Sequence, residues 1–352
     1  MRDLAILCVR NEGAFLLDWL AHHQCVGFTD FLVFSNDCTD GTDLILDRLA
    51  ELGHLTHIRN DGPFDKGGIQ FTALKAAAKH DAVQQADWIL PLDIDEFVNI
   101  HTGDGTLSDL RAALPEATAI TLTWRLFGND GHVRFEDRPV PDIFTKAAPE
   151  ILHWPWRAAM FKTFYANDGT YRKPGVHRPR DPDTDKLDAA RWFDCEGRAL
   201  GERFKTRQLF SPFGRPNYRL AQINHYALGA MESYVLKADR GRAVHSDHLL
   251  GLDYWTERNW CLEEDLSISR YAQARAEAKA RLMGDSALVE LDRKAIAWRH
   301  ARFDMLMEKE PFRALFARLL MAPPARAIPP SAAKFLHGYA RRDRQKSAQG
   351  SV

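Results

Sequence analysis

The chain has 352 residues, of which 45% are hydrophobic and 27% are charged, as in an ordinary globular protein of one large or two smaller domains. Its 47 Lys and Arg residues nearly balance its 48 Asp and Glu residues, so we expect no nucleic-acid partner. The five cysteines are odd in number and include no Cys-x-x-Cys pair. This argues against a disulfide framework or a zinc knuckle and for a reducing compartment.

The N-terminal residues "MRDLAILCVRNEG" do not have the pattern of a secretory signal, because the apolar run is short and polar residues follow it at once. No stretch approaches the roughly 20 apolar residues that a membrane-spanning helix needs. We therefore expect a cytoplasmic protein without a transmembrane segment.

The first hundred residues alternate between short apolar runs, typical of buried strands, and segments with helical periodicity. This alternation predicts a parallel α/β sheet with right-handed crossovers. The expected strands cover residues 4–9, 28–35, 55–60 and 87–93, and the expected helices cover residues 13–27, 42–52 and 69–86.

The pattern changes beyond Pro115. Alternating β-branched residues predict a strand at 117–128, an irregular segment rich in Pro, Trp, Arg and Asp follows to about residue 216, and nearly everything from residue 230 is predicted to be helical. The segment "KFLHGYARRDRQKSAQ" is basic and then polar. It predicts a solvated helix that frays into a tail, or alternatively a contact with anionic lipid headgroups. We expect a first domain at 1–229, a helical region at 230–340 and a disordered tail at 341–352.

Polar residues follow each of the first four expected strands, at the edge where ligands bind in open parallel sheets. We therefore expect one crevice to hold residues from all four strand ends. These residues are Arg10, Asn11 and Glu12 after the first strand, Ser35, Asn36 and Asp37 after the second, Asn60 and Asp61 after the third, and Asp93, Asp95 and Glu96 after the fourth.

The stretch "SNDCTDGTD" at 35–43 has two interpretations. Asp40 and Gly41 favour a tight turn, and Asp or Thr before the next helix would cap it. Asn36 and Asp37 are less well explained by capping, and could instead accept hydrogen bonds from a base or a ribose.

The stretch "DIDE" at 93–96 is a candidate metal site. The sequence lacks both glycine-rich phosphate-binding patterns, so the charge of a bound phosphate would be met by a metal or by side-chain cations. Asp93 and Asp95 stand two apart, on one side of an extended chain, and their hard oxygen ligands suit magnesium or manganese. The alternative is a solvated acidic loop or a helix cap.

The stretch "CVRNEGAFLLDWLAHHQCVGFTDFLVFSNDCTDGT", followed by "PLDIDEF", resembles the family 2-like nucleotide-sugar glycosyltransferases of the GT-A fold, and most closely the bacterial branch related to glycosyltransferase family 92. The resemblance covers roughly residues 4–130 and continues more loosely through "WRLFGNDGH", "GVHRP" and "INHYALGAMESYVLKADRGRA". It implies a GT-A (Rossmann-like), mostly parallel sheet with flanking helices. The nucleotide-sugar half would lie at 1–115, an irregular acceptor half at 116–229, and a helical extension at the C-terminus.

The resemblance also implies roles for individual residues. "DID" matches the D-x-D motif of the family, so Asp93 would face the ribose and the metal, and Asp95 would coordinate a Mn²⁺ or Mg²⁺ ion. A late histidine, His225 or else His177, would add a metal ligand, although a lone histidine is often simply buried. The residues expected to line the nucleoside pocket are Arg10, Asn11, Glu12, Asn36 and Asp37, with Asp40 nearby.

The implied reaction moves a sugar from a nucleoside-diphosphate sugar to a hydroxyl of a glycan, lipid or protein acceptor, with inversion. Lys237, Arg240 and Arg242 could add positive charge near the leaving group, or could form a solvated helix face. Inversion needs a carboxylate base. The first candidate is Asp130 in "FGNDG", which is also an ordinary turn sequence, and the alternatives are Glu96 and the pair Glu264 and Asp265.

Two other functions share this pattern in part. A nucleotidyltransferase would use the same metal and nucleotide, but we expect it to have a glycine-rich loop near the first strand, where "CVRNEGAF" has none. A non-catalytic sugar-nucleotide binding module is disfavoured by the intact acidic cluster. A D-x-D-x-[TV] phosphatase is excluded, because "DIDEF" follows the fourth strand and has Phe97 where Thr or Val is needed.

Overall fold

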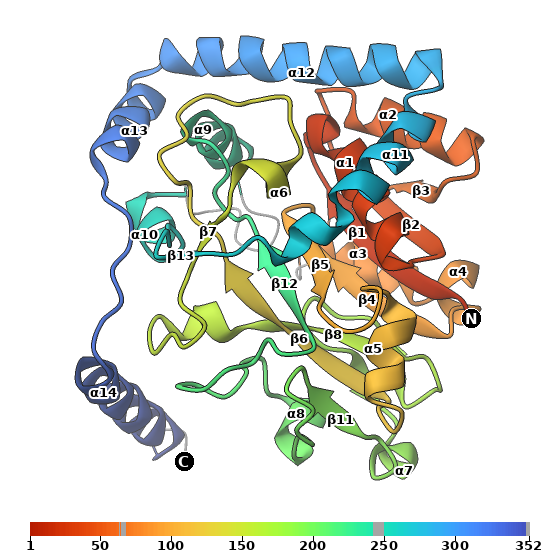
Figure 1. Ribbon diagram of the computed structural model, residues 1–352, viewed down its shortest axis with the longest axis vertical. Helices are drawn as coiled ribbons and strands as arrows, with labels where there is room; N and C mark the ends of the chain where they lie inside the picture. The colour runs from red at the N-terminus through yellow and green to blue at the C-terminus, as the bar shows by residue number, and fades with distance from the viewer. Residues whose placement is uncertain (63, 65–67, 242–249, 350–352) are drawn as a thin grey trace.

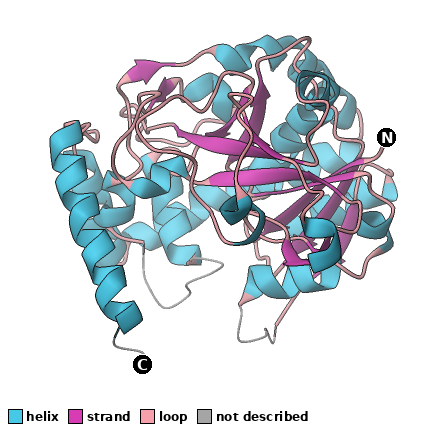
Figure 2. Ribbon diagram, turned by 90° about the horizontal axis from the view of Figure 1, so that it is seen from below, coloured by secondary structure: helices cyan, strands magenta, loops and turns pink. Residues whose placement is uncertain are grey.

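The computed structural model describes residues 1–62, 64, 68–241 and 250–349. Its centre is a curled sheet flanked by helices (Figures 1 and 2). Among the described residues this sheet has nine strands, in the order β3-β2-β1-β4-β8-β6-β12-β5, with β11 paired to β6. Two small two-stranded sheets, β9 with β10 and β7 with β13, lie outside it.

The N-terminal half contains the four parallel strands that the sequence predicts, in the order β3-β2-β1-β4. The strands are β1 (Asp3–Val9), β2 (Asp30–Ser35), β3 (Thr56–Arg59) and β4 (Trp88–Leu92), and the helices are α1 (Gly13–Val26), α2 (Thr42–Glu51), α3 (Ile69–Ala77) and α4 (Asp81–Gln84).

Both faces of β1 are buried, as its continuous apolar run predicts. Ala5 and Leu7 belong to one hydrophobic cluster with residues of α1 and α2, whereas Leu4 and Ile6 belong to another with residues of α3. The alternation of side chains along a strand explains this division. The helices are therefore fixed on the sheet, and the loops at the carboxyl ends of the strands have a rigid base.

One predicted helix, residues 69–86, is wrong in its extent. The structure has two short helices, because α3 ends at Ala77 and α4 begins at Asp81. His80 lies between them, and its ring nitrogen accepts a hydrogen bond from the backbone N–H of Ala82 at 3.1 Å. This contact starts a new helix where composition alone predicts a continuous one.

The second half of the sheet includes strands that the sequence analysis did not predict. β5 (Glu96–Ile100) follows the acidic turn directly and pairs antiparallel with β12 (Ala221–His225), which runs parallel to β6 (Ala119–Leu126). β8 (Phe161–Ala166) fills the space between β4 and β6, antiparallel to both. The register pairs Glu96 with His225, 129 positions later in the sequence, and so brings the acidic turn after β4 to the end of β12.

The remaining elements of the middle region are short. They are α5 (Leu107–Ala113), α6 (Val140–Ile143), β7 (Lys146–Ala147), the 3-10 helix η1 (Trp156–Ala159), β9 (Tyr171–Lys173), β10 (Arg180–Pro182), α7 (Thr184–Leu187), β11 (Trp192–Asp194) and α8 (Glu202–Thr206).

The C-terminal region is mainly helical, as expected, and it packs on the N-terminal half. α11 and α12 lie against α1 and α2 (Figure 1). Residues 341–349 lie in α14, where a disordered tail was predicted; their Ala, Arg, Lys and Gln residues favour helix. The elements are α9 (Met231–Arg240), α10 (Leu252–Thr256), β13 (Glu263–Glu264), the 3-10 helix η2 (Ser267–Tyr271), α11 (Ala272–Leu282), α12 (Ser286–Met307), α13 (Glu310–Met321) and α14 (Pro330–Gln349).

The strand order and directions confirm the expected α/β fold class, a Rossmann-like and mostly parallel sheet with flanking helices. Within the described part of the chain, no helix combines the length and the apolar character that crossing a bilayer requires.

Candidate active site

The acidic stretch "DIDE" forms a tight turn between β4 and β5. The backbone N–H of Glu96 donates to the carbonyl of Asp93 at 3.1 Å, so the chain reverses between them. The prediction that Asp93 and Asp95 lie on one side of an extended chain is therefore wrong. Each carboxylate has its own set of partners.

Asp95 meets the side chains of β12 and α9. Lys237 donates to Asp95 Oδ2 at 2.7 Å and to the carbonyl of Ala227 at 2.7 Å, and His225 Nε2 lies 3.6 Å from Asp95 Oδ1. Burial alone would raise the pKa of Asp95, but the charge of Lys237 and the neighbouring His225 hold it well below its usual range. Asp95 is thus an ionised carboxylate, and Lys237, whose pKa the Asp95 charge raises against the effect of burial, stays a cation.

Asp93 is held on the other side of the turn. It accepts hydrogen bonds from Gln70 Nε2 and from Lys162 Nζ, both at 3.0 Å. Lys162 comes from β8 and its side chain is fully buried. Burial lowers the pKa of Lys162, but the charges of Asp93 and Glu96 outweigh that effect and raise it, so a buried cation lies beneath the turn.

Glu96, the member of the turn that the sequence left unexplained, anchors it from inside. Its Oε1 accepts from Trp124 Nε1 at 2.7 Å, and its Oε2 accepts from the backbone N–H of Asp93 at 2.9 Å and lies 3.3 Å from Lys162 Nζ. Glu96 is completely buried, and this burial raises its pKa to about 8. A carboxyl group without surface cannot reach an acceptor hydroxyl, so the structure removes Glu96 from the candidates for the base.

The two histidines lie close to the turn but differ in their contacts. His225 packs against Trp124 with ring centroids 4.2 Å apart, and its Nδ1 has no hydrogen-bond partner within the described residues. Burial lowers the pKa of His225, so its imidazole is neutral. His177 bonds through Nδ1 to the carbonyl of Phe161 at 3.0 Å, and burial and the Lys162 charge lower its pKa to about 3.

Asp95 and His225 fit one part of a divalent-metal site. Their ionised carboxylate and neutral imidazole are the states that bind metals, and at 3.6 Å the two groups satisfy each other poorly by hydrogen bonding. In the described part of the chain no three His, Cys, Asp or Glu side chains are grouped to hold a metal, so Asp93 and His177 do not complete this pair. Mg²⁺ sites often combine one or two carboxylates with substrate phosphates, and a two-residue site of this kind agrees with that pattern.

Arg240 of α9 ties the end of β1 to the site. Its guanidinium forms an ion pair with Glu12 and donates to the carbonyl of Arg10 at 2.9 Å, and Arg10 donates back to the carbonyl of Arg240 at 3.4 Å. Burial opposes the charge on Arg240, but Glu12 raises its pKa. Arg242 lies outside the described residues.

The other residues expected at the nucleoside have different surroundings. Asn11 Oδ1 accepts from the backbone N–H of Thr39 at 2.7 Å, and Asp40 accepts from the backbone N–H groups of Gly13 and Thr42, both at 2.9 Å. Asn11 and Asp40 therefore shape the loops. Asn36 is buried beside Asp37, whose side chain is exposed at the strand end.

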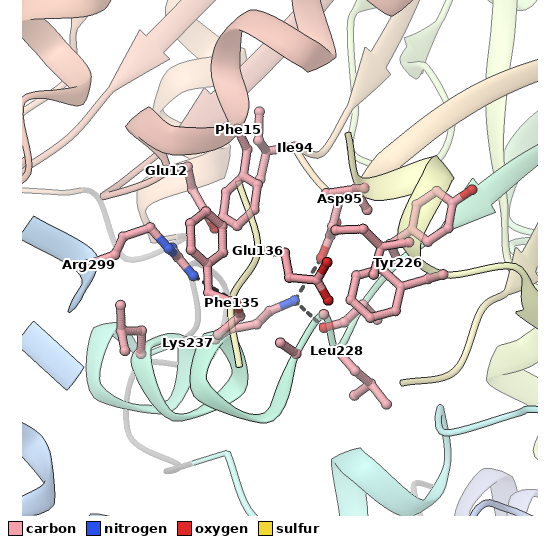
Figure 3. A pocket seen from close by; sticks show the side chains of 18 of the residues that line it. Glu12, Phe15, Ile94, Asp95, Phe135, Glu136, Tyr226, Leu228, Lys237 and Arg299 are labelled. Atoms are coloured by element: carbon pink, nitrogen blue, oxygen red, sulfur yellow. Dashed lines mark hydrogen bonds and ion pairs between the residues drawn. The ribbon is translucent and has the colours of Figure 1, made fainter. Parts of the chain in front are cut away.

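A pocket opens between the acidic turn, α1, α9 and the loop that follows β6 (Figure 3). Its lining includes two aromatic side chains, Phe15 and Phe135, which contact each other edge to face at 5.8 Å. Both lie against the Arg299 guanidinium, with ring centroids 4.5 and 4.8 Å from Arg299 Cζ. Among the predicted residues it brings together Asn11, Glu12, Asp95, Lys237 and Arg240.

Glu136 lines the same pocket and was not predicted. It is paired with His132 at 3.2 Å and Arg138 at 3.1 Å, and hydrogen bonds from Arg138 and His132 lower its pKa. Asp130, the first sequence candidate for the base, is exposed in a turn at φ 50° and does not line the pocket. Glu264 pairs with Lys146, and Asp265 accepts from Gln222 and Ser267.

Sequence reasoning missed Lys162 and Trp124 as well as Glu136. Lys162 stands alone in the apolar stretch "MFKTFYA", and a lone charge in a buried strand is a signal for a specific partner. Glu136 has no comparable signal, because "RFEDR" is indistinguishable from a solvated loop.

Comparison with known proteins relates the first half of the chain to one family. Residues 6–164 match the family model described as glycosyltransferase family 92. The chain is related to glycosyltransferase family 92. The resemblance stated above is confirmed at the level of this relationship.

The curated relatives are distant and much longer. A glycosyltransferase family 92 protein of Oryza sativa subsp. japonica is 25% identical over 150 residues, which are 40% of this chain and 24% of that protein. One of Ricinus communis is 26% identical over 97 residues, 27% of this chain and 16% of that protein. The chain thus matches no more than about a quarter of either relative's length.

Solved structures resemble the chain only weakly. S. aureus TarS 1-349 in complex with UDP has a TM-score of 0.31 and 17% identity over 47% of each chain. Glucosyl-3-phosphoglycerate synthase from Mycobacterium tuberculosis, in complex with Mn²⁺, UDP and glucosyl-3-phosphoglycerate, has a TM-score of 0.24 and 15% identity over 35% of this chain and 44% of that one.

Proposed function

We propose that the protein is a metal-dependent glycosyltransferase that moves a sugar from a nucleoside-diphosphate sugar to an acceptor hydroxyl, with inversion at the anomeric carbon. The observation that carries the proposal is the group of Asp95, His225 and Lys237 at the carboxyl end of the sheet, in a chain related to glycosyltransferase family 92. The acceptor, a glycan, lipid or protein, would enter by the pocket beside this group.

The diphosphate of the donor binds where the cations converge. Lys237 and Arg240 project from one helix, α9, and the pKa of each is raised by a carboxylate partner, so both remain charged. Asp95 and His225 would hold a divalent ion together with the diphosphate, and that ion supplies positive charge to the leaving phosphate. As the anomeric bond breaks, Lys237 stabilises the same negative charge from the protein side.

The nucleoside binds at the ends of β1 and β2 in this proposal. Arg10, Asn36 and Asp37 lie there, and the backbone N–H of Asp37 donates to Asp61 at 2.8 Å, which joins the ends of β2 and β3. Asn11 and Asp40 act indirectly, since their oxygens are used to hold the loops. Asp93 positions the turn through its contact with Lys162, and His177 has no direct contact with the donor in this proposal.

Glu136 is the base that we propose for the acceptor hydroxyl. It lines the pocket with Asp95 and Lys237, and its lowered pKa keeps it ionised at neutral pH. Removing a general base lowers kcat by about 10²–10⁴-fold. We expect Glu136→Gln to lose that much transfer while Asp130→Asn, an exposed carboxylate outside the pocket, loses little; the reverse result would restore Asp130 as the base.

The decisive experiment for the function measures which product the donor releases. The full chain is incubated with a panel of nucleotide sugars, with and without Mn²⁺, and the solution is assayed for free nucleoside diphosphate. Glycosyl transfer or its hydrolytic side reaction releases nucleoside diphosphate, a nucleotidyltransferase releases pyrophosphate from nucleoside triphosphate, and a binding module releases neither.

Asp95→Asn serves as the test variant and Asp188→Asn, an exposed carboxylate after α7, as its matched control. We expect the first to lose about 10²–10³-fold in product formation, as when one charge-stabilising group is removed, and the second to lose nothing. Wild-type turnover by Asp95→Asn would contradict the assignment of the site.

A cytoplasmic location belongs to the same proposal. All five cysteines lie in described parts of the chain and are unpaired, which is the usual state in a reducing compartment.

A further inference from the structure

A groove beneath α14 is lined by basic side chains. It lies between α14 and the segments around His153 and α8, at the edge of the molecule that carries the C-terminus (Figure 1). No carboxylate belongs to its lining among the described residues. The basic members of the lining are His153, Arg203, Arg207, Lys334 and His337.

The inner face of α14 fixes this helix to the protein. Ala333 is buried, and the ring of His337 packs against those of Trp154 and Phe213 with centroids 5.4 and 5.1 Å apart. His337 Nε2 also lies 3.2 Å from the carbonyl of His153. The helix is therefore held in one orientation, with a defined outer face.

That outer face is an aromatic stripe that ends in a cation. Phe335 and Tyr339 are 64% and 54% exposed, stand one turn apart and touch edge to face at 4.9 Å. Arg342, one turn further, places its guanidinium 4.2 Å from the Tyr339 ring centroid. Within the described part of the chain, no other segment covers the rings of Phe335 and Tyr339.

The charge of this region differs from that of the whole. Residues 334–349 contain Lys334, Arg341, Arg342, Arg344 and Lys346 against one acidic residue, Asp343, although the full chain has a formal net charge of -1. Helices that lie in the interface of an anionic membrane carry exposed aromatic side chains next to positive charges. α14 has both features. A second copy of this chain would bring like charges together, which disfavours self-association through the same surface.

We propose that the outer face of α14 docks the protein on a membrane that contains anionic lipids. Phe335 and Tyr339 would enter the headgroup layer, while Lys334 and Arg342 would contact lipid phosphates. This surface is separate from the pocket that contains Asp95, so docking and glycosyl transfer can fail independently.

The test is cosedimentation of the full chain with phosphatidylcholine vesicles, with and without phosphatidylglycerol, at low and high salt. We expect binding to the anionic vesicles alone, weakened by salt. The double substitution Phe335→Ser and Tyr339→Ser, and separately Lys334→Glu with Arg342→Glu, should each lower the partition coefficient on the order of tenfold. Met305→Ser, at an exposed apolar position on α12, is the matched control and should bind like the wild type.

Three results would overturn the proposal. One is equal binding to neutral and anionic vesicles, or to neither. Another is that the wild type forms a dimer in the absence of vesicles and that the α14 variants are monomeric. The surface would then be a contact between two copies of the chain. The third is a thermal shift by inorganic phosphate without any vesicle binding. Circular dichroism and nucleotide-sugar turnover of every variant confirm that the fold and the active site are unchanged.

Discussion

At the scale of single residues, the acidic turn depends on a buried cation. Lys162 lies under the turn with no exposed surface, 3.0 Å from Asp93 and 3.3 Å from Glu96. An ammonium group in this position is tolerated only because carboxylates surround it. The same contacts orient the backbone that carries Asp95, so Lys162 links the interior of the sheet to the candidate metal ligand.

We therefore expect Lys162→Met to destabilise the fold. The change keeps most of the volume but leaves Glu96 and Asp93 without their cation, and breaking a buried ion pair costs about 3–5 kcal/mol. Above pH 8, where Glu96 is ionised, adding Glu96→Gln to this variant should recover part of the loss, because a neutral side chain then replaces a buried charge that has lost its cation. Urea denaturation of the two single variants and the double variant measures the coupling; a loss below about 1 kcal/mol for Lys162→Met would contradict this account.

Part of the site follows from the sequence and part does not. Asp95, His225 and Lys237 are identifiable because the motifs "DID", "INHY" and "VLKADRGR" stand out in the chain, and the structure brings them together. Lys162 and Glu136 are not identifiable in this way. Their importance depends on partners far away in sequence, and a single sequence does not pair them.

At the scale of elements, Asp285 joins α12 to α2. Its Oδ1 accepts from the backbone N–H of Leu288 at 3.0 Å and so caps α12. Arg48 of α2 binds both carboxylate oxygens, at 3.2 and 2.6 Å. Hydrogen bonds from Arg48 and from the helix backbone lower the pKa of Asp285 to about 2.

This lowered pKa predicts a pH dependence. A carboxyl whose folded-state pKa is below its unfolded value near 4 contributes stability above that value and loses it as the pH falls towards 2. Asp285→Asn keeps a capping oxygen but loses the ion pair. Its unfolding temperature should therefore be lower than that of the wild type at pH 7, and the gap should close by about pH 2.

Thermal scans from pH 7 downwards measure this difference. Glu290→Gln is the matched control on the same helix. It removes an exposed pair with Arg293, and such pairs contribute little. An Asp285→Asn protein whose deficit is unchanged at pH 2 would show that the capping geometry, and not the charge, is responsible.

β5 shows why some elements escape prediction. Its sequence "EFVNI" follows the acidic turn without a gap, so the sequence alone assigns Glu96 to the polar loop after β4. The strand is stabilised by β12, and the register that pairs Glu96 with His225 is set by residues more than a hundred positions away. The parallel strands at residues 3–92 were predictable because β1, β2 and β4 are local apolar runs and at least one helix separates each strand from the next.

At the scale of the whole molecule, α11 and the first half of α12 form part of the same core as the N-terminal half, whereas α9, α10, α13 and the end of α12 share a second hydrophobic cluster. Lys279 of α11 pairs with Asp18 of α1 at 2.8 Å, and Ala278, Leu282 and Leu288 belong to the hydrophobic cluster that contains Trp19. The sequence suggests a boundary at residue 230. In the structure the secondary structure changes there, but residues on both sides of this boundary pack in one hydrophobic cluster.

We expect the chain to unfold in a single cooperative transition. The calorimetric and van't Hoff enthalpies should agree, because the N-terminal half cannot lose α11 and α12 without exposing α1. Two separated transitions in differential scanning calorimetry would contradict this shared core.

The central claim is that Asp95, His225 and Lys237 bind the diphosphate of a nucleotide sugar with a divalent metal. Thermal shifts of the full chain with nucleoside diphosphates, with and without Mn²⁺, test it most directly. We predict that at least one nucleotide stabilises the wild type, by about 2.7 kcal/mol at a hundredfold excess over Kd, that Mn²⁺ increases this effect, and that Asp95→Asn abolishes the increase. No shift with any nucleotide in either condition, or an equal shift in Asp95→Asn, would contradict the claim.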